Sequence, residues 1–144
     1  MPLKSDRGLK TNLNTAEFEL LVPANNKNTA LQAIKSGADA VYIGYKKYGA
    51  RIQAGNSMED LIWVVEFAHL YGAKVYITLN TILNDEEIKQ AEKIIQKLYE
   101  IKADGIIIQD MGLLECDLPP IPLIASTQCH NNSIEKIRFL EKTG

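Results

Sequence analysis

The sequence predicts an α/β fold in which the strands of a parallel sheet alternate with helices. Five short apolar runs, rich in Val, Ile, Leu and Tyr, recur along the chain. The segments between most of them carry apolar residues at helical spacing, with Asn, Ser or Gly at the boundaries. Continuous apolar strands that alternate with amphipathic helices are typical of a parallel sheet that is covered on both faces. We therefore expect both faces of the sheet to be covered.

The first predicted strand is Glu19–Ala24, a short apolar run that ends around Pro23. The helix after it is expected to take Asn28 as its N-cap and to end near Gly37. Residues 1–16 are polar and charged, so we interpret them as a flexible N-terminal arm that precedes one domain, residues 17–144.

The second strand is predicted at Asp39–Gly44, which is rich in β-branched and aromatic residues. Ser57 and Asp60 have the spacing of a capping box, which opens a helix over Met58–Tyr71. The residues expected on its inward face are Leu61, Val64, Val65 and Ala68.

The third unit repeats this order, with a strand at Lys74–Asn80 and a helix at Asp85–Ile101. Asn84 and Glu87 form the capping pattern of that helix. Its predicted inward residues are Ile88, Ala91, Ile94, Ile95 and Leu98.

Two further strands are predicted at Gly105–Asp110 and Leu123–Thr127. Ser133 is the expected cap of a last helix, with Ile137 and Leu140 facing inward. Two architectures fit this order of elements: an open doubly wound sheet and part of an eight-stranded barrel. The G-x-G-x-x-G signature of dinucleotide binding is absent, but periodicity alone does not separate the two.

Composition narrows the class of protein. Of 144 residues, 46% are hydrophobic and 24% are charged, which is close to the average for soluble domains. The net charge of −2 gives no general basic surface for nucleic acid. No apolar run is long enough to span a membrane, and the polar N-terminus is unlike a signal peptide. Cys116 and Cys129 form no C-x-x-C pair. We therefore expect a cytoplasmic protein with no metal site in this chain.

In both architectures ligands bind at the carboxyl ends of the strands. The residues predicted there are amides, hydroxyls, one carboxylate and a cationic loop that contains Lys46, Lys47 and Arg51. Such a loop suits a carboxylate or a phosphate, because Arg binds either through two parallel hydrogen bonds. It is equally typical of a solvated surface loop.

Two residues at this edge are candidates for catalysis. Asp110 is placed to act as a general base, or to cap the turn that follows it. Ser126 is a candidate nucleophile, although there is no G-x-S-x-G motif and no assured histidine partner.

The order of motifs resembles the collagenase-like peptidase family (peptidase family U32). The resemblance begins with ELLVPAN at residues 19–25 and GADAVYIG at residues 37–44. It continues through Arg51, Asn56 and the strand ending in Asn80, and then through Asp110, Gly112 and ASTQ at residues 125–128. It covers about residues 19–144. Three positions depart from the family pattern: Val22, Asn25 and Tyr45 stand where Ala, Gly and often a second Gly are usual.

The resemblance implies a TIM-barrel-like fold, of which this chain supplies about five β/α units. Relatives of this kind hydroxylate transfer RNA, ribosomal RNA or the ubiquinone ring, and prephenate is implicated as the hydroxyl donor in the RNA branch. Several hold an iron–sulfur cluster through cysteines well downstream, so no cofactor is expected in this chain. The positions expected to line the pocket are Arg51, Asn80, Asp110, Ser126 and Gln128.

These observations lead to the prediction of an N-terminal portion of an RNA-modifying hydroxylation enzyme, inactive alone. The expected partner is an anionic small molecule or RNA, and it would bind to the full-length protein. A peptidase is the alternative that the family name suggests. A non-catalytic binding or assembly module is the other alternative.

A partial barrel leaves the edges of its first and last strands unpaired, so we expect a homodimer through these exposed sheet edges.

Overall fold

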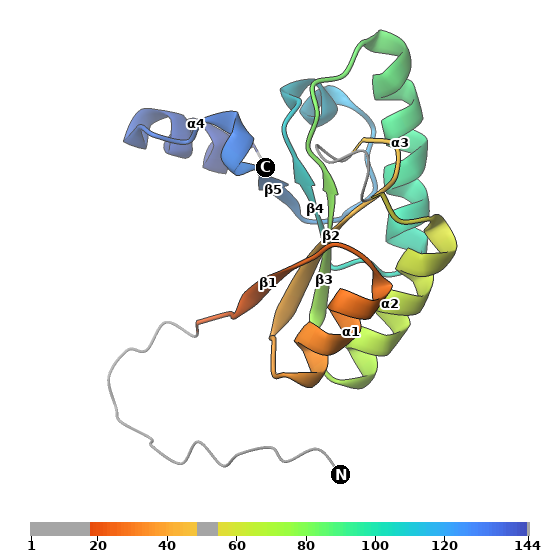
Figure 1. The fold of residues 1–144 in the computed structure, drawn as a ribbon. Helices are drawn as coiled ribbons and strands as arrows, with labels where there is room; N and C mark the ends of the chain where they lie inside the picture. Colours follow the sequence, from red (N-terminus) through yellow and green to blue (C-terminus); the bar gives the residue numbers. More distant parts are fainter. Residues whose placement is uncertain (1–17, 49–54, 144) are drawn as a thin grey trace.

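The computed structural model describes residues 18–48 and 55–143 and contains one sheet of five parallel strands (Figure 1). The strands are β1 (Leu21–Ala24), β2 (Ala40–Gly44), β3 (Lys74–Leu79), β4 (Gly105–Ile108) and β5 (Leu123–Ala125). The α-helices are α1 (Lys27–Lys35), α2 (Met58–Leu70), α3 (Asp85–Glu100) and α4 (Ile134–Thr143). Two short 3₁₀ helices, η2 (Met111–Glu115) and η3 (Thr127–Cys129), flank β5.

The strands are ordered as they occur in the chain, β1-β2-β3-β4-β5, and each neighbouring pair is parallel. Helices α1, α2 and α3 lie together on one face of the sheet (Figure 1). Right-handed crossovers that always advance in one direction leave every helix on the same face, whereas a doubly wound sheet reverses its order. The arrangement is therefore that of a partial (β/α) barrel.

The expectation that both faces of the sheet are covered is not met within the part of the chain that the structure describes. Apolar runs on the strands suggested two covered faces, but the second face carries Tyr42, Tyr76 and Ile107, which are only half-buried. In a barrel this second face is the inner one, and strands rather than helices close it. We call it the inner face below.

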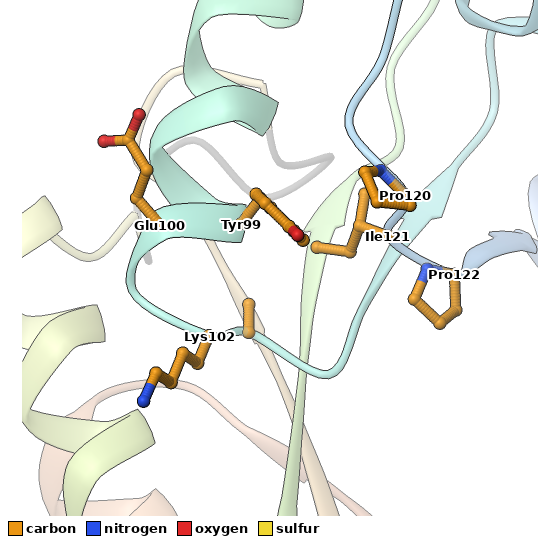
Figure 2. Close-up of a pocket in the computed structure, with 7 residues that line it drawn as sticks. Tyr99, Glu100, Lys102, Pro120, Ile121 and Pro122 are labelled. Carbon is orange, nitrogen blue, oxygen red and sulfur yellow. The ribbon is translucent and has the colours of Figure 1, made fainter.

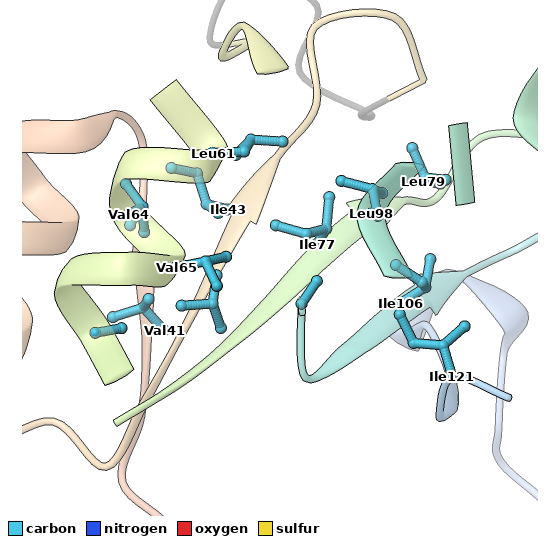
Figure 3. Packing of buried hydrophobic residues seen from close by; sticks show 14 of the residues in the cluster. Val41, Ile43, Leu61, Val64, Val65, Ile77, Leu79, Leu98, Ile106 and Ile121 are labelled. Carbon is cyan, nitrogen blue, oxygen red and sulfur yellow. The ribbon is translucent and has the colours of Figure 1, made fainter. Parts of the chain in front are cut away.

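The hydrophobic core lies between the sheet and α1–α3 (Figure 3). Val41 and Ile43 of β2 point toward α2, whose Leu61, Val64 and Val65 are buried as predicted. The same layer continues over β3 and β4 with Ile77, Leu79, Ile106 and Leu98 of α3. Four of the five residues predicted to face inward from α3 are buried, and Ile88 is half-buried.

Capping explains where the helices begin. Ser57 and Asp60 form the predicted capping box of α2, and Asn84 and Glu87 form that of α3. The prediction for α1 was wrong by two residues, because Asn26 and not Asn28 is its N-cap. The Asn26 side chain accepts a hydrogen bond from the backbone of Thr29, and the Thr29 hydroxyl accepts one from the Asn26 N–H.

The C-terminal part departs from the regular pattern. Only η2 connects β4 to β5, so no α-helix continues the α1–α3 layer at that point. Helix α4 extends away from that layer (Figure 1) and buries none of its residues. Ile137 was expected to face inward but is exposed, and Leu140 is only half-buried. None of the helices in the described ranges is long and apolar enough to cross a membrane.

Candidate binding site at the carboxyl ends of the strands

The carboxyl ends of the five strands meet at one edge of the sheet, and the predicted polar residues follow those ends. Lys46 and Lys47 follow β2, Asn80 follows β3, and Gln128 lies in η3 after β5. Lys46, Lys47 and Gln128 are exposed, and Asn80 is half-buried. Arg51 lies outside the described residues. The structure thus brings four of the predicted binding residues to the edge where ligands of barrel proteins bind.

A buried amide ties the first two strand ends together. Asn56 is 6% exposed, and its Nδ2 donates to the carbonyl oxygens of Asn25, at 3.2 Å, and Gly44, at 3.0 Å. Its backbone N–H donates to Gly44 O, and Lys46 N–H donates to Asn56 O, both at 3.1 Å. Asn56 therefore fixes the base of the loop that carries Lys46 and Lys47. The sequence placed Asn56 in the motif series but gave no sign of this role.

The described start of the cationic loop is anchored on α3. Tyr48 is buried, and its hydroxyl donates to Gln90 Oε1 at 2.9 Å. The Lys47 ammonium donates to the same oxygen, and Thr81 Oγ1 donates to the Tyr48 carbonyl at 3.3 Å. Lys47 is thus held in place by a neutral amide, which leaves its positive charge uncompensated by a carboxylate at that contact.

Asp110 makes the interactions of a cap. Its Oδ1 accepts from the backbone N–H of Gly112 and its Oδ2 from that of Leu83, both at 2.8 Å. The first bond caps η2, and the second ties the loop after β3 to the end of β4. Both carboxylate oxygens are therefore engaged with backbone, as the capping interpretation requires.

Ser126 is 4% exposed, and it caps η3. Its Oγ accepts from Gln128 N–H at 3.2 Å, and its carbonyl accepts from Asn131 Nδ2 at 3.1 Å. His130 Nε2 lies 3.0 Å from Asn132 Nδ2. The described contacts of Ser126 thus include no hydrogen bond to a histidine, and they do not form the serine–base pair of a hydrolase.

An ionic network lies on the inner face at the opposite, amino end of the strands. Glu19 Oε2 lies 2.8 Å from Lys74 Nζ, and Tyr76 Oη donates to Glu19 Oε1 at 3.0 Å. The hydrogen bond from Lys74, with help from Tyr76, lowers the pKa of the Glu19 carboxyl. The Glu19 carboxylate raises the pKa of Lys74, and partial burial raises that of the Tyr76 hydroxyl. Tyr76 is consequently held in one orientation on the inner face.

Figure 2 shows a pocket of about 380 Å³ that lies away from this edge. Its lining includes Tyr99 of α3 and Pro120, Ile121 and Pro122, which lead into the amino end of β5. Glu100 and Lys102 extend away from its centre (Figure 2). The pocket contains none of the predicted site residues.

The iron–sulfur cluster implied for longer relatives does not fit the cysteines of this chain. A cluster of that kind takes four thiolates, and the sequence has two cysteines. Cys129 is buried with Sγ 3.5 Å from Ile108 O, and burial raises the pKa of the Cys116 thiol. No group of three or more metal-binding side chains gathers within residues 18–48 and 55–143.

Comparison with known proteins agrees with the fold. The structure of a U32 peptidase superposes with a TM-score of 0.74 at 12% identity, covering 94% of this chain and 59% of that one. At this identity the match supports the fold alone. It confirms the predicted TIM-barrel-like arrangement.

Two curated relatives are similar in sequence. The 23S rRNA 5-hydroxycytidine C2501 synthase of Escherichia coli is 50% identical over 132 residues, covering 92% of this chain and 20% of the relative. The tRNA hydroxylation protein P1 of Bacillus subtilis is 35% identical over 134 residues, covering 90% of this chain and 32% of the relative. The chain thus spans about a fifth to a third of these relatives.

The sequence profile of Peptidase family U32 matches residues 25–144. The matched region includes β2 to β5, all of α1–α4 and the polar edge described above. The chain therefore belongs to Peptidase family U32.

Proposed function

We propose that this chain forms part of an RNA-hydroxylating enzyme and contributes one side of its substrate site. The observation that carries the proposal is the 50% identity to the 23S rRNA 5-hydroxycytidine synthase over 92% of the chain. A second relative that acts in RNA hydroxylation matches over a similar span. Since the chain covers only 20% of the first relative, the complete reaction is assigned to the full gene product.

The polar edge suits this role. Lys46 and Lys47 supply positive charge beside the strand ends, where a phosphate of the RNA backbone would bind. Asn80 and Gln128 supply amide groups, which donate and accept hydrogen bonds at the edges of bases. The chain has a net charge of −2, so this local pair of lysines, and not a general basic surface, is the proposed RNA contact.

Complementation tests the proposal. The full gene product that carries this chain is expressed in an E. coli strain that lacks the C2501 synthase, and 5-hydroxycytidine at position 2501 of its 23S rRNA is measured by mass spectrometry. We expect hydroxylation to be restored by the full gene product and not by residues 1–144 alone.

Two controls sharpen this experiment. The E. coli synthase itself is the positive control, and an empty vector is the negative one. Rescue by the 144-residue chain alone would show that it is a complete enzyme. Failure of the soluble full gene product to restore 5-hydroxycytidine at position 2501 would contradict the proposal.

The peptidase alternative finds no support in the geometry. The Ser126 hydroxyl accepts from the backbone N–H of Gln128 and the Ser126 carbonyl from the side-chain amide of Asn131, and no metal-binding cluster exists among the described residues. Cleavage of a gelatin substrate by the full gene product, abolished by Ser126→Ala, would favour this alternative instead.

A further inference from the structure

The inner face of the sheet differs from the usual interior of a barrel. Barrel interiors are mostly filled by Val, Ile and Leu, and here the buried residues of that kind on β2 and β3 point to the helices, whereas tyrosine and glycine stand on the inner face of these strands. Alternation along the strands places on the inner face Tyr42, Gly44, Tyr76, Thr78, Gly105, Ile107 and Ile124. Two close approaches confirm this placement. A Cβ on Gly44 would lie 3.3 Å from Thr78 Oγ1, and one on Gly105 would lie 3.1 Å from Tyr76 Cδ1.

The inner face changes in character along the strands. At the amino end, Glu19, Lys74 and Tyr76 form the ionic network described above. In the middle, Tyr42 and Tyr76 are directly paired across β2 and β3. Toward the carboxyl end Thr78, which is 9% exposed, stands in one row with Ile107 and Ile124.

More neutral polar groups follow where the strands end. Gln109 follows β4, and its Nε2 lies 3.4 Å from the carbonyl oxygen of Gln128. Beside Ser126, the Oδ1 atom of Asn131 is buried and has no hydrogen-bond partner among the described residues. The carboxyl end of the inner face therefore combines the apolar Ile107 and Ile124 with neutral hydrogen-bonding groups, next to the paired rings of Tyr42 and Tyr76.

Two glycines allow their neighbours to approach the strands closely on this face. Gly44 stands beside Thr78 at the carboxyl end, and Gly105 lies under the ring of Tyr76. A side chain at either position would press on a neighbour. The two glycines allow the Tyr76 ring to lie over β4 and leave the space next to Thr78 free of a methyl group.

We propose that the carboxyl end of the inner face receives one nucleobase turned out of its RNA strand. This inference rests on the proposed RNA-hydroxylating function and adds where the base binds and how it is recognised. A nucleobase is planar and neutral, with donors and acceptors at its edge, and it stacks on aromatic rings. These properties match the paired tyrosine rings and the neutral polar groups next to them.

The division of charge supports the same occupant. Lys46 and Lys47 lie on the loop after β2, and the Lys47 ammonium donates to Gln90 of α3, on the helix side of the sheet, where it would meet a phosphate. The carboxyl end of the inner face holds Thr78, Gln109 and Ser126, none of which carries a charge. The described cations around this region are Lys46 and Lys47 on the loop after β2 and Lys136 of α4, whose ammonium donates to the carbonyl oxygens of Cys129 and His130. A base seated among the neutral groups would place its phosphates toward these cations.

The test distinguishes hydrogen bonding to the base, which should affect the rate of hydroxylation, from contacts with the RNA backbone, which should affect the dissociation constant. Thr78→Val and Gln109→Leu remove polar groups from the inner face, and Gly44→Ala narrows it. The matched controls are Thr143→Val at the end of α4 and Gln96→Leu on α3. Each substitution is made in the full gene product. The rate of hydroxylation and the dissociation constant for the substrate RNA are both measured.

We expect Thr78→Val and Gln109→Leu to lower the rate of hydroxylation by roughly fivefold to tenfold, the effect of one lost hydrogen bond. The dissociation constant should change less than twofold, since the phosphate contacts remain. The controls should match the parent in both quantities. In the same RNA, a fluorescent pyrrolocytosine at the target position should report unstacking on binding to the parent.

The outcomes distinguish the two proposals. Absence of hydroxylation by the parent protein would overturn the proposed function itself. An active parent whose Thr78→Val and Gln109→Leu variants hydroxylate at the parental rate would overturn only this inference. So would an equal loss of rate and affinity. If Thr78→Val fails to fold, Gln109→Leu decides the matter, because Gln109 is half-buried at the end of β4.

Discussion

Asp110 shows how a single carboxylate at a strand end supports two interpretations from sequence, general base or cap. In the structure its two carboxylate oxygens accept hydrogen bonds from the backbone N–H groups of Leu83 and Gly112. Asp110→Ala leaves both donors without an acceptor, so we expect the free energy of unfolding to fall by about 1–2 kcal/mol. Urea unfolding of the 144-residue chain measures this. Asp117→Ala, at an exposed position, is the control.

An equal urea midpoint for Asp110→Ala and the parent would contradict the capping role. In that case the carboxylate would be retained for chemistry, and Asp110→Asn in the full gene product would abolish hydroxylation without a change in stability.

The Glu19 carboxyl should make the free energy of unfolding depend on pH. Its folded-state pKa is lowered, chiefly by the hydrogen bond from Lys74. A group with a lowered pKa stabilises the fold above its unfolded-state pKa, and this contribution disappears as the pH falls through the folded value. Glu19→Gln should therefore be less stable than the parent at pH 7, and the difference should shrink in acid. Urea unfolding across that range measures it, with Glu141→Gln as control. A difference independent of pH would contradict the ionic network.

At the scale of elements, local signals predicted most of the fold. The capping boxes at Ser57 and Asn84 fixed the starts of α2 and α3, because cap and hydrophobic spacing agreed there. At α1 the run Asn25-Asn26-Lys27-Asn28 offers several equivalent caps, and only the contact with Thr29 selects Asn26. Strand ends were predicted up to two residues too long, since the polar residues after β4 and β5 continue the alternation but cap 3₁₀ turns instead.

The error at α4 has a different origin. Ile137 and Leu140 have the spacing of an inward face, but periodicity identifies an apolar stripe and does not say what it packs against. The candidate site shows the same limit. Asn80 and Gln128 could be placed at the edge because the carboxyl ends of parallel strands lie together. Thr78 lies within an apolar strand, and the sequence alone does not show which face of the sheet its side chain occupies.

Helices α3 and α4 should respond differently to the same substitution. Ile95 of α3 is completely buried, so Ile95→Ala should cost about 2–5 kcal/mol of unfolding free energy. Ile137 of α4 is 51% exposed, and Ile137→Ala should change stability by less than about 1 kcal/mol. Urea unfolding of both variants measures the contrast. A loss at Ile137 as large as that at Ile95 would mean that α4 packs its apolar stripe against another surface in solution.

At the scale of the whole molecule, the described part of the chain has its core on one side of the sheet. The helix side is closed by α1–α3, whereas Leu21 of β1 and Ile124 of β5 are 41% and 36% exposed on the inner face. Both residues lie on the first and last strands, which pair with one neighbour each in the described sheet. Strand edges and apolar faces of this kind favour association.

We therefore expect the 144-residue chain to self-associate through its sheet edges. Light scattering after size exclusion should give a mass above the 16.1 kDa of one chain. Ile124→Lys places a charge on edge strand β5 and should lower that mass, because a charged edge resists pairing. Ile82→Lys is the matched control, since Ile82 is 76% exposed in the loop after β3. A parent that elutes as a stable 16.1 kDa monomer without binding a dye for apolar surfaces would contradict association. It would imply that the apolar residues of the inner face are covered within a single chain. A mass lowered equally by both lysine variants would place the contact elsewhere than at β5.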